Sequence, residues 1–169
     1  MPLHRLKTLA LLSLAFGCAH ADPSATSIPM TEKGTATYFV TAEIGNESIE
    51  LLVDTGAGYT TLNQTLLRRL KASGDATPIG EIEGILANGT VCVLPVYRVA
   101  RLDLGGCRLE NIEVAETPSD ARNLLGLSAL KKAAPFTFSL NPAELRLSNC
   151  DNAVADRGEK RSTSLSSLY

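Results

Sequence analysis

The segment Leu51-Leu52-Val53-Asp54-Thr55-Gly56-Ala57-Gly58 places a carboxylate directly after three apolar residues and before a run of small ones. A short apolar run bounded by turn residues is typical of a buried strand. The small residues that follow let backbone amides come close to the carboxylate of Asp54. Because Asp and Gly are also common in ordinary turns at strand ends, the surrounding sequence has to decide whether this segment is a site.

The chain on both sides of Asp54 has a mostly β pattern, which predicts an all-β domain with one or two short helices. Strands are expected at Thr35–Ile44, Ile49–Val53, Val96–Leu104, Leu109–Ala115, Phe136–Leu140 and Glu144–Leu147. Helices are expected from the N-cap Asn63 to Leu70, with a stop near Gly74, and at Leu127–Lys132. Asn88-Gly89, inside the hairpin candidate Gly84–Leu94, favours a type I′ turn.

A weak internal repeat relates the two halves of the domain. Ile44-Gly45-Asn46-Glu47-Ser48-Ile49 matches Leu104-Gly105-Gly106-Cys107-Arg108-Leu109 in pattern, 60 positions later. Each copy predicts a hairpin turn, a strand and then an apolar pair near a glycine. We match Leu52-Val53-Asp54-Thr55-Gly56 of the first copy with Leu124-Leu125-Gly126 of the second, so only the first copy carries an acid.

With these features in order, the chain resembles the retropepsin-like (clan AA) single-domain aspartic proteases, and most closely their bacterial exported members. The resemblance covers about Thr35 to Leu147 and implies a closed β-barrel or sandwich protomer with a flap hairpin. Ala87-Asn88-Gly89-Thr90 falls where the family has its flap tip, which would contact the substrate. Leu124-Leu125-Gly126 matches the element before the family's short helix, and Arg122-Asn123 resembles the family's Arg-Asn/Asp pair.

The resemblance implies an aspartic-type endopeptidase in which Asp54 is the catalytic residue. Thr55, Gly56 and Ala57 would support the active-site loop, Thr55 by hydrogen bonds across a dimer axis. Two carboxylates about 3 Å apart can share one proton, so that one acts as base toward water and the other as acid. Since the chain has one such motif, the partner implied is a second copy, in a homodimer that cleaves polypeptides without a cofactor. The alternative is a catalytically silent peptide-binding module of the same fold in the cell envelope.

Composition excludes several other classes of function. Both histidines, His4 and His20, lie in the first 21 residues, which predict a removable signal peptide. The mature chain would then have no imidazole for a Ser-His-Asp triad or for a histidine-ligated zinc site, and no cysteine spacing resembles a metal site. The net charge of −2 is too close to zero for a protein that binds nucleic acid by electrostatics.

The ends of the chain predict export to the periplasm or the medium. Residues 1–21 combine a basic start, a short apolar run and the cleavage signal Ala19-His20-Ala21. A lipobox-like Ala15-Phe16-Gly17-Cys18 leaves a lipid anchor at Cys18 as the alternative.

Residues 22–33 are expected to form a linker, 34–150 the protease domain and 151–169 a disordered polar tail. Cys92, Cys107 and Cys150 permit one disulfide, and the sequence leaves the pair open.

Overall fold

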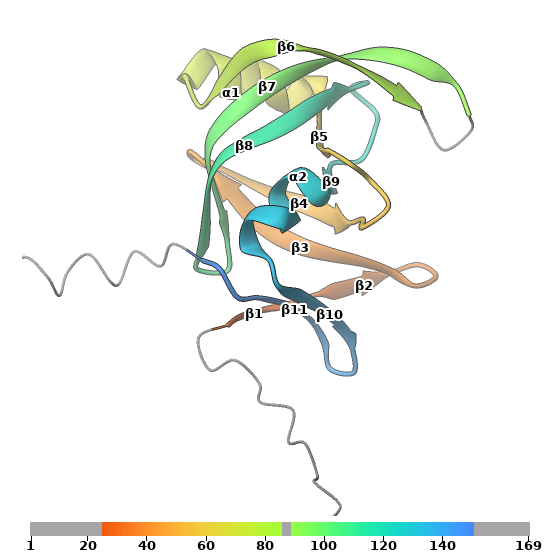
Figure 1. Ribbon diagram of the computed structural model, residues 1–169, viewed down its shortest axis with the longest axis vertical. Helices are drawn as coiled ribbons and strands as arrows, with labels where there is room; N and C mark the ends of the chain where they lie inside the picture. The colour runs from red at the N-terminus through yellow and green to blue at the C-terminus, as the bar shows by residue number, and fades with distance from the viewer. Residues whose placement is uncertain (1–24, 86–88, 151–169) are drawn as a thin grey trace, which may run out of the picture.

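The computed structural model describes residues 25–85 and 89–150. These residues form two β-sheets in which most neighbouring strands are antiparallel (Figure 1). The larger sheet has the strand order β2-β3-β4-β9-β5-β8-β7-β6, and the smaller one the order β1-β11-β10. The strands are β1 (Thr26–Pro29), β2 (Thr31–Lys33), β3 (Thr37–Ile44), β4 (Glu47–Val53), β5 (Thr60–Asn63), β6 (Ala76–Ile85), β7 (Val91–Leu104), β8 (Cys107–Thr117), β9 (Leu124–Leu125), β10 (Phe136–Leu140) and β11 (Ala143–Leu147). The helices are α1 (Gln64–Ser73), α2 (Leu127–Leu130) and a 3-10 turn at Lys131–Ala133. The all-β class with two short helices is confirmed.

The larger sheet closes on itself. An additional antiparallel contact joins β3 to β7 at Glu43 and Asp103, although β4, β9, β5 and β8 lie between these two strands in the sheet. The enclosed core includes fully buried leucines contributed by both sheets and α1, among them Leu51, Leu62, Leu67, Leu125 and Leu145. The expected closed β-barrel architecture is therefore present.

Helix α1 begins after the predicted N-cap Asn63 and ends next to the predicted stop Gly74, three residues beyond the expected last residue Leu70. The side chain of Asn63 accepts a hydrogen bond from the Leu66 amide at 2.9 Å, which satisfies one of the free amides of the first turn. Gly74 ends the helix in the left-handed region at φ 85°. Leu66, Leu67 and Leu70 form its buried face.

The repeat is present as two hairpins, β3–β4 and β7–β8. The predicted match of Leu124-Leu125-Gly126 with the Asp54 segment is wrong. Strand β9 precedes α2 as β5 precedes α1. In addition, β4 pairs in parallel with β9, and β8 pairs in parallel with β5. Leu124-Leu125 therefore corresponds to β5, and it lies beside the Asp54 segment instead of repeating it.

The folded unit begins before the expected domain start. Strands β1 and β2 lie within residues 22–33, which composition predicted as a linker. Strand β1 pairs with β11, and the side chains of Ile28 and Met30 are buried. These two apolar residues anchor a segment whose Pro, Ser and Thr content is typical of loops.

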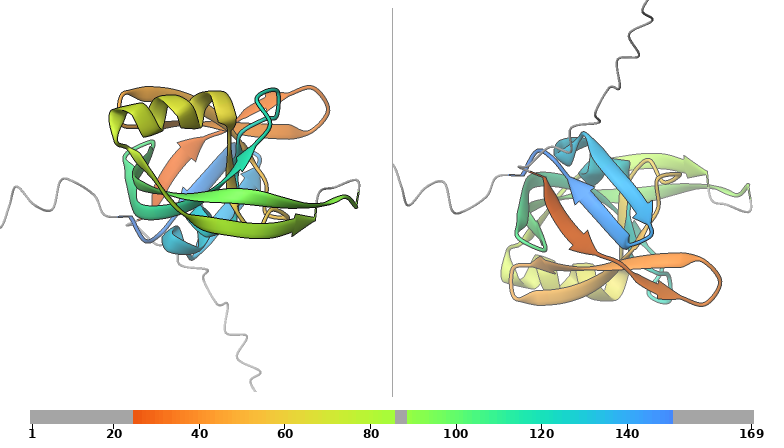
Figure 2. Two further views of the ribbon diagram at one scale, coloured as in Figure 1. Left: turned by 90° about the horizontal axis from the view of Figure 1, so that it is seen from above. Right: turned by 90° about the horizontal axis from the view of Figure 1, so that it is seen from below.

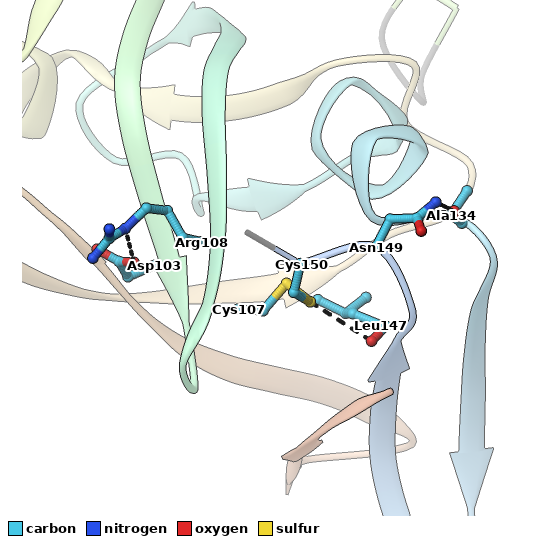
Figure 3. The surroundings of a disulfide bond; sticks show 7 residues. All are labelled: Asp103, Cys107, Arg108, Ala134, Leu147, Asn149 and Cys150. Carbon is cyan, nitrogen blue, oxygen red and sulfur yellow. Dashed lines mark hydrogen bonds and ion pairs between the residues drawn. A yellow bond between two sulfur atoms is a disulfide. The ribbon is translucent and has the colours of Figure 1, made fainter. Parts of the chain in front are cut away.

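A disulfide joins Cys107 to Cys150, the pair of cysteines that the sequence could not identify (Figure 3). Cys107 is the first residue of β8, and Cys150 follows β11, so the bond fastens the end of the folded unit to the larger sheet. Beside it, Arg108 donates a hydrogen bond to Asp103 at 3.3 Å. Cys92 is a free, half-buried thiol on β7.

The predicted signal peptide, the alternative anchor residue Cys18 and the predicted tail 151–169 lie outside the described residues. Among the helices of residues 25–85 and 89–150, none is long and apolar enough to cross a membrane.

Candidate active site

Asp54 lies at the point where β4 leaves the sheet, between the strand and a turn of small residues. Its amide donates to the Leu125 carbonyl at 3.1 Å, which extends the pairing of β4 with β9 by one residue. The Gly56 amide donates to the Asp54 carboxylate at 2.9 Å. The Ala57 amide donates to the Asp54 carbonyl at 3.3 Å and closes the turn. The carboxylate is therefore held by the backbone of its own loop, as expected for small residues at these positions.

Gly126 supports the other end of this loop. Its amide donates to the Thr60 hydroxyl at 3.1 Å, and the Leu127 amide donates to the Ala57 carbonyl at 2.9 Å. A Cβ atom at Gly126 would overlap the Tyr59 carbonyl, so only glycine fits there. The Leu-Leu-Gly element thus positions the Asp54 loop.

Ser128 is a positioning residue that the sequence did not indicate. Its hydroxyl accepts from the Thr60 amide at 2.8 Å and donates to the Glu113 carbonyl at 2.7 Å. It therefore bridges β5 to β8 behind the Asp54 loop. A lone serine in an expected short helix carries no sequence signal for this role, because the bridge depends on strands that are distant in the sequence.

The two residues of the expected Arg122-Asn123 pair have different surroundings in the structure. Asn123 accepts from the Asn63 amide at 2.8 Å through its side chain, and from the Leu52 amide at 3.0 Å through its carbonyl. It thus joins the starts of α1 and β9 to β4. Arg122 is exposed and forms no ion pair with any residue in the described parts of the chain.

An open cleft of about 580 Å³ lies above the loop and under the β6–β7 hairpin. Asp54 and the loop residues line its floor, while β6 and β7 provide one wall. Its lining is mainly apolar, and its residues are Asp54, Gly56, Ala57, Gly58, Tyr59, Thr61, Ile82, Glu83, Gly84, Ile85, Leu94, Ala115, Thr117 and Leu124. Thr55 is exposed beside the cleft, where it can be reached by another chain.

The β6–β7 hairpin is present, and its register differs from the expected turn. Ile85 pairs with Val91, which leaves an odd number of residues between the paired positions. A two-residue type I′ turn at Asn88-Gly89 needs an even number in an unbroken ladder. Gly89 has φ 82°, which suits the left-handed position of a longer turn, and Thr90 precedes β7. Ala87 and Asn88 lie outside the described residues, so their predicted substrate contacts stay predictions.

Two carboxylates outside the cleft stabilise the surrounding elements. Glu47, at the start of β4, forms a two-point contact with Arg69 of α1 at 2.8 and 3.0 Å, and this hydrogen bonding lowers the pKa of Glu47. On β11, hydrogen bonds from Ser27 and Arg146 lower the pKa of Glu144. Within residues 25–85 and 89–150, no group of three His, Cys, Asp or Glu side chains could hold a metal ion.

Comparison with known proteins gives two findings. The family described as "gag-polyprotein putative aspartyl protease" matches residues 40–132, which include Asp54, α1, the β6–β7 hairpin and α2. A retropepsin-like aspartic protease from Rickettsia conorii is similar in structure, with a TM-score of 0.54 and 18% identity, over 73% of this chain and 90% of that chain. At that identity the likeness shows the fold. No curated protein sequence matches the chain.

Proposed function

Because the chain belongs to the retropepsin-like aspartic protease family, we propose that it is an aspartic endopeptidase whose active site forms when two copies bring their Asp54 carboxylates together. The observation that carries the proposal is Asp54 itself. Its carboxylate is held by the Gly56 amide at the floor of an open cleft beneath a β-hairpin. One protomer supplies one such carboxylate, so a symmetric homodimer supplies the pair.

The chemistry follows from two carboxylates that share one proton. Both cannot ionise at close range, so one is charged and the other neutral. The charged carboxylate takes a proton from a water molecule as the water oxygen attacks the peptide carbonyl carbon. The neutral carboxylate gives its proton to the carbonyl oxygen. Proton transfer to the amide nitrogen then breaks the carbon–nitrogen bond, and two peptides leave.

The cleft suits an extended polypeptide as substrate. It is open, mainly apolar and bordered by the strands of the β6–β7 hairpin. Closure of this hairpin over a peptide would exclude water other than the attacking molecule. Backbone hydrogen bonds from the hairpin would hold the peptide in register.

The proposal includes export, supported by the signal-peptide pattern of residues 1–21. Mass spectrometry of the protein recovered from the cell envelope or medium tests it. A mature chain that begins at Asp22 is expected, whereas one that begins at a lipid-modified Cys18 would indicate the anchored alternative. An intact Met1 in the mature protein would contradict export.

The decisive experiment is digestion of a peptide library by the full chain at several pH values. The wild type is expected to cleave peptides, with its highest rate at acidic pH, where the pair of carboxylates holds one proton. Asp54→Asn is expected to abolish hydrolysis, because an amide cannot act as the base. Asp120→Asn, at an exposed turn residue that does not line the cleft, is the matched control and is expected to retain the rate.

The outcomes separate this proposal from the binding alternative. Hydrolysis that persists in Asp54→Asn would contradict the mechanism. Peptide binding by both forms without turnover at any pH would show a silent peptide-binding module. EDTA is expected to leave the wild-type rate unchanged, because carboxylates and not a metal activate the water.

A further inference from the structure

The charged residues that line the cleft are all acidic. They are Asp54 and Glu83, and no lysine or arginine lines the cleft in the described parts of the chain. The sequence of the two segments that face each other accounts for this. Leu51–Asn63, which contains the loop, has Asp54 as its single charged residue, and Ile79–Tyr97 of the hairpin has Glu81 and Glu83. The cleft therefore has a negative potential, which favours a positively charged group.

Glu83 lies on the wall of the cleft and not on the loop that carries Asp54. The β6–β7 hairpin extends over this loop, which joins β4 to β5, as the side view in Figure 1 and the view from above in Figure 2 show. Glu83 belongs to β6, pairs with Val93 of β7 and is exposed. Within residues 25–85 and 89–150, its carboxylate forms no hydrogen bond and no ion pair. Its charge is thus available to a ligand in the cleft.

Two buried hydroxyls belong to the floor of the cleft. Thr61 of β5 pairs with Ala115 of β8 and with Leu124 of β9, and all three residues line the cleft. Because paired residues have their side chains on the same face of a sheet, the Thr61 side chain lies on the cleft face. Thr117 shares this face, since it follows Ala115 by two residues.

The hydroxyls of Thr61 and Thr117 lack a hydrogen-bond partner among the residues that the structure describes. The Thr61 residue is only 9% exposed, so water does not compensate its hydroxyl as it would at the surface. A buried polar group without a partner costs free energy. The floor thus has two oxygen atoms that can accept hydrogen bonds from a ligand.

The other lining residues suit the stem of a long basic side chain. Ile82 and Leu94 of the hairpin and Leu124 of β9 give the cleft an apolar surface. Lysine and arginine bury their methylene groups against such a surface while their charged ends contact polar groups. An acidic side chain would instead meet the like charges of Asp54 and Glu83. Lysine and arginine therefore match both the apolar lining and the charge of the cleft.

We propose that the cleft selects polypeptides with a lysine or arginine next to the cleaved bond, and that Glu83 determines this specificity. The inference rests on the proposed function, because it names the substrate class of the same site. The Glu83 carboxylate pairs with the ammonium or guanidinium group, whose remaining N–H groups donate to the Thr61 and Thr117 hydroxyls. Since a symmetric dimer has this arrangement twice, a basic residue on either side of the cleaved bond is favoured.

Three peptide libraries test this specificity, and they differ in having lysine, glutamine or glutamate at one fixed position. Initial rates of cleavage by the full chain are measured at about pH 6, where glutamate carboxylates are ionised. The lysine library is expected to be cleaved about three- to tenfold faster than the glutamine library, and the glutamate library more slowly still. This preference is expected to shrink in about 1 M salt, because salt screens exposed charges.

Variants of the hairpin assign the preference to one residue. Glu83→Gln removes the charge at nearly constant size, so the lysine library is expected to be cleaved at the rate of the glutamine library. Glu83→Lys is expected to reverse the order and favour the glutamate library. Glu81→Gln, on the same strand but not lining the cleft, is the matched control and is expected to keep the wild-type preference. Circular dichroism checks that the variants fold.

Thr61→Val tests the floor of the cleft. Valine has nearly the same shape as threonine, and the lost hydroxyl has no partner in the described chain, so the melting temperature is expected not to fall. Cleavage of the lysine library is nevertheless expected to slow by about threefold or more, because its side chain loses an acceptor. A rate equal to that of the wild type would overturn the role of Thr61.

Equilibrium binding of the same libraries separates this inference from the proposed function. If the wild type cleaves all three libraries equally, the specificity is wrong and the enzyme proposal stands. If the wild type cleaves nothing but binds the lysine library most tightly, and Glu83→Gln loses this difference, the specificity stands and the enzyme proposal falls. A preference for lysine that persists in Glu83→Gln would overturn the role of Glu83. A chain that neither binds nor cleaves any library would overturn both proposals.

Discussion

At the scale of single residues, the absence of a side chain at Gly126 keeps the Asp54 loop in position. The Gly126 amide bonds to the Thr60 hydroxyl, and its α-carbon faces the Tyr59 carbonyl. The requirement for glycine comes from this close approach. Asp54 depends on the same region, because its amide donates to Leu125.

Gly126→Ala is expected to lower the free energy of unfolding by about 1–3 kcal/mol, because the new methyl group would force backbone apart. It is also expected to reduce peptide hydrolysis by displacing the loop that holds Asp54. Thermal unfolding and the rate of hydrolysis measure the two effects. Gly58→Ala is the control for stability, since a Cβ atom there has no neighbour within 4 Å. Equal stability of the two variants would contradict the role of Gly126.

At the scale of elements, the contact between Glu47 and Arg69 fastens α1 to the start of β4. The α1 boundaries could be predicted from the cap residues Asn63 and Gly74, since capping is local. The contact of α1 with β4 could not be predicted from the sequence, because it joins residues 22 positions apart. Ser128 likewise connects residues that only the folded sheet brings together.

The lowered pKa of Glu47 predicts a pH dependence of stability. Since the folded protein binds the proton of Glu47 less tightly than the unfolded chain, this contact stabilises the fold above the unfolded-state pKa. The stabilisation is lost as the pH falls through the folded-state pKa. Glu47→Gln is therefore expected to unfold at a lower temperature than the wild type near neutral pH and at the same temperature in strong acid. A difference in melting temperature that is independent of pH would contradict this.

At the scale of the whole molecule, the disulfide and the closed barrel hold distant parts of the chain together. Cys107 and Cys150 are 43 residues apart, and the loop between them includes β8, β9, α2 and the β10–β11 hairpin. The bond limits the unfolded chain more than a short loop would.

Cys150→Ser is expected to lower the free energy of unfolding by about 2–4 kcal/mol, because the unfolded chain regains freedom. Cys92→Ser, which removes the free thiol, is the matched control and is expected to have a much smaller effect. Denaturant titration of the three proteins measures the differences. A reductant is expected to reduce wild-type stability toward that of Cys150→Ser and to leave Cys150→Ser unchanged.

Asp54 as the site residue stays a prediction that rests on the family resemblance. The sequence by itself determined the class of the fold, the N-cap of α1 and the two glycine hairpins, β3–β4 and β7–β8. These features follow from local propensity, capping and periodicity, which neighbouring residues control. Only the tertiary structure decided the cysteine pair, the inclusion of β1 and β2 in the sheets, the register of the β6–β7 hairpin and the place of Leu124-Leu125 beside Asp54. Each of these depends on which strands meet across long sequence separations. The pairing of these strands follows from the burial of all the apolar faces in one closed core.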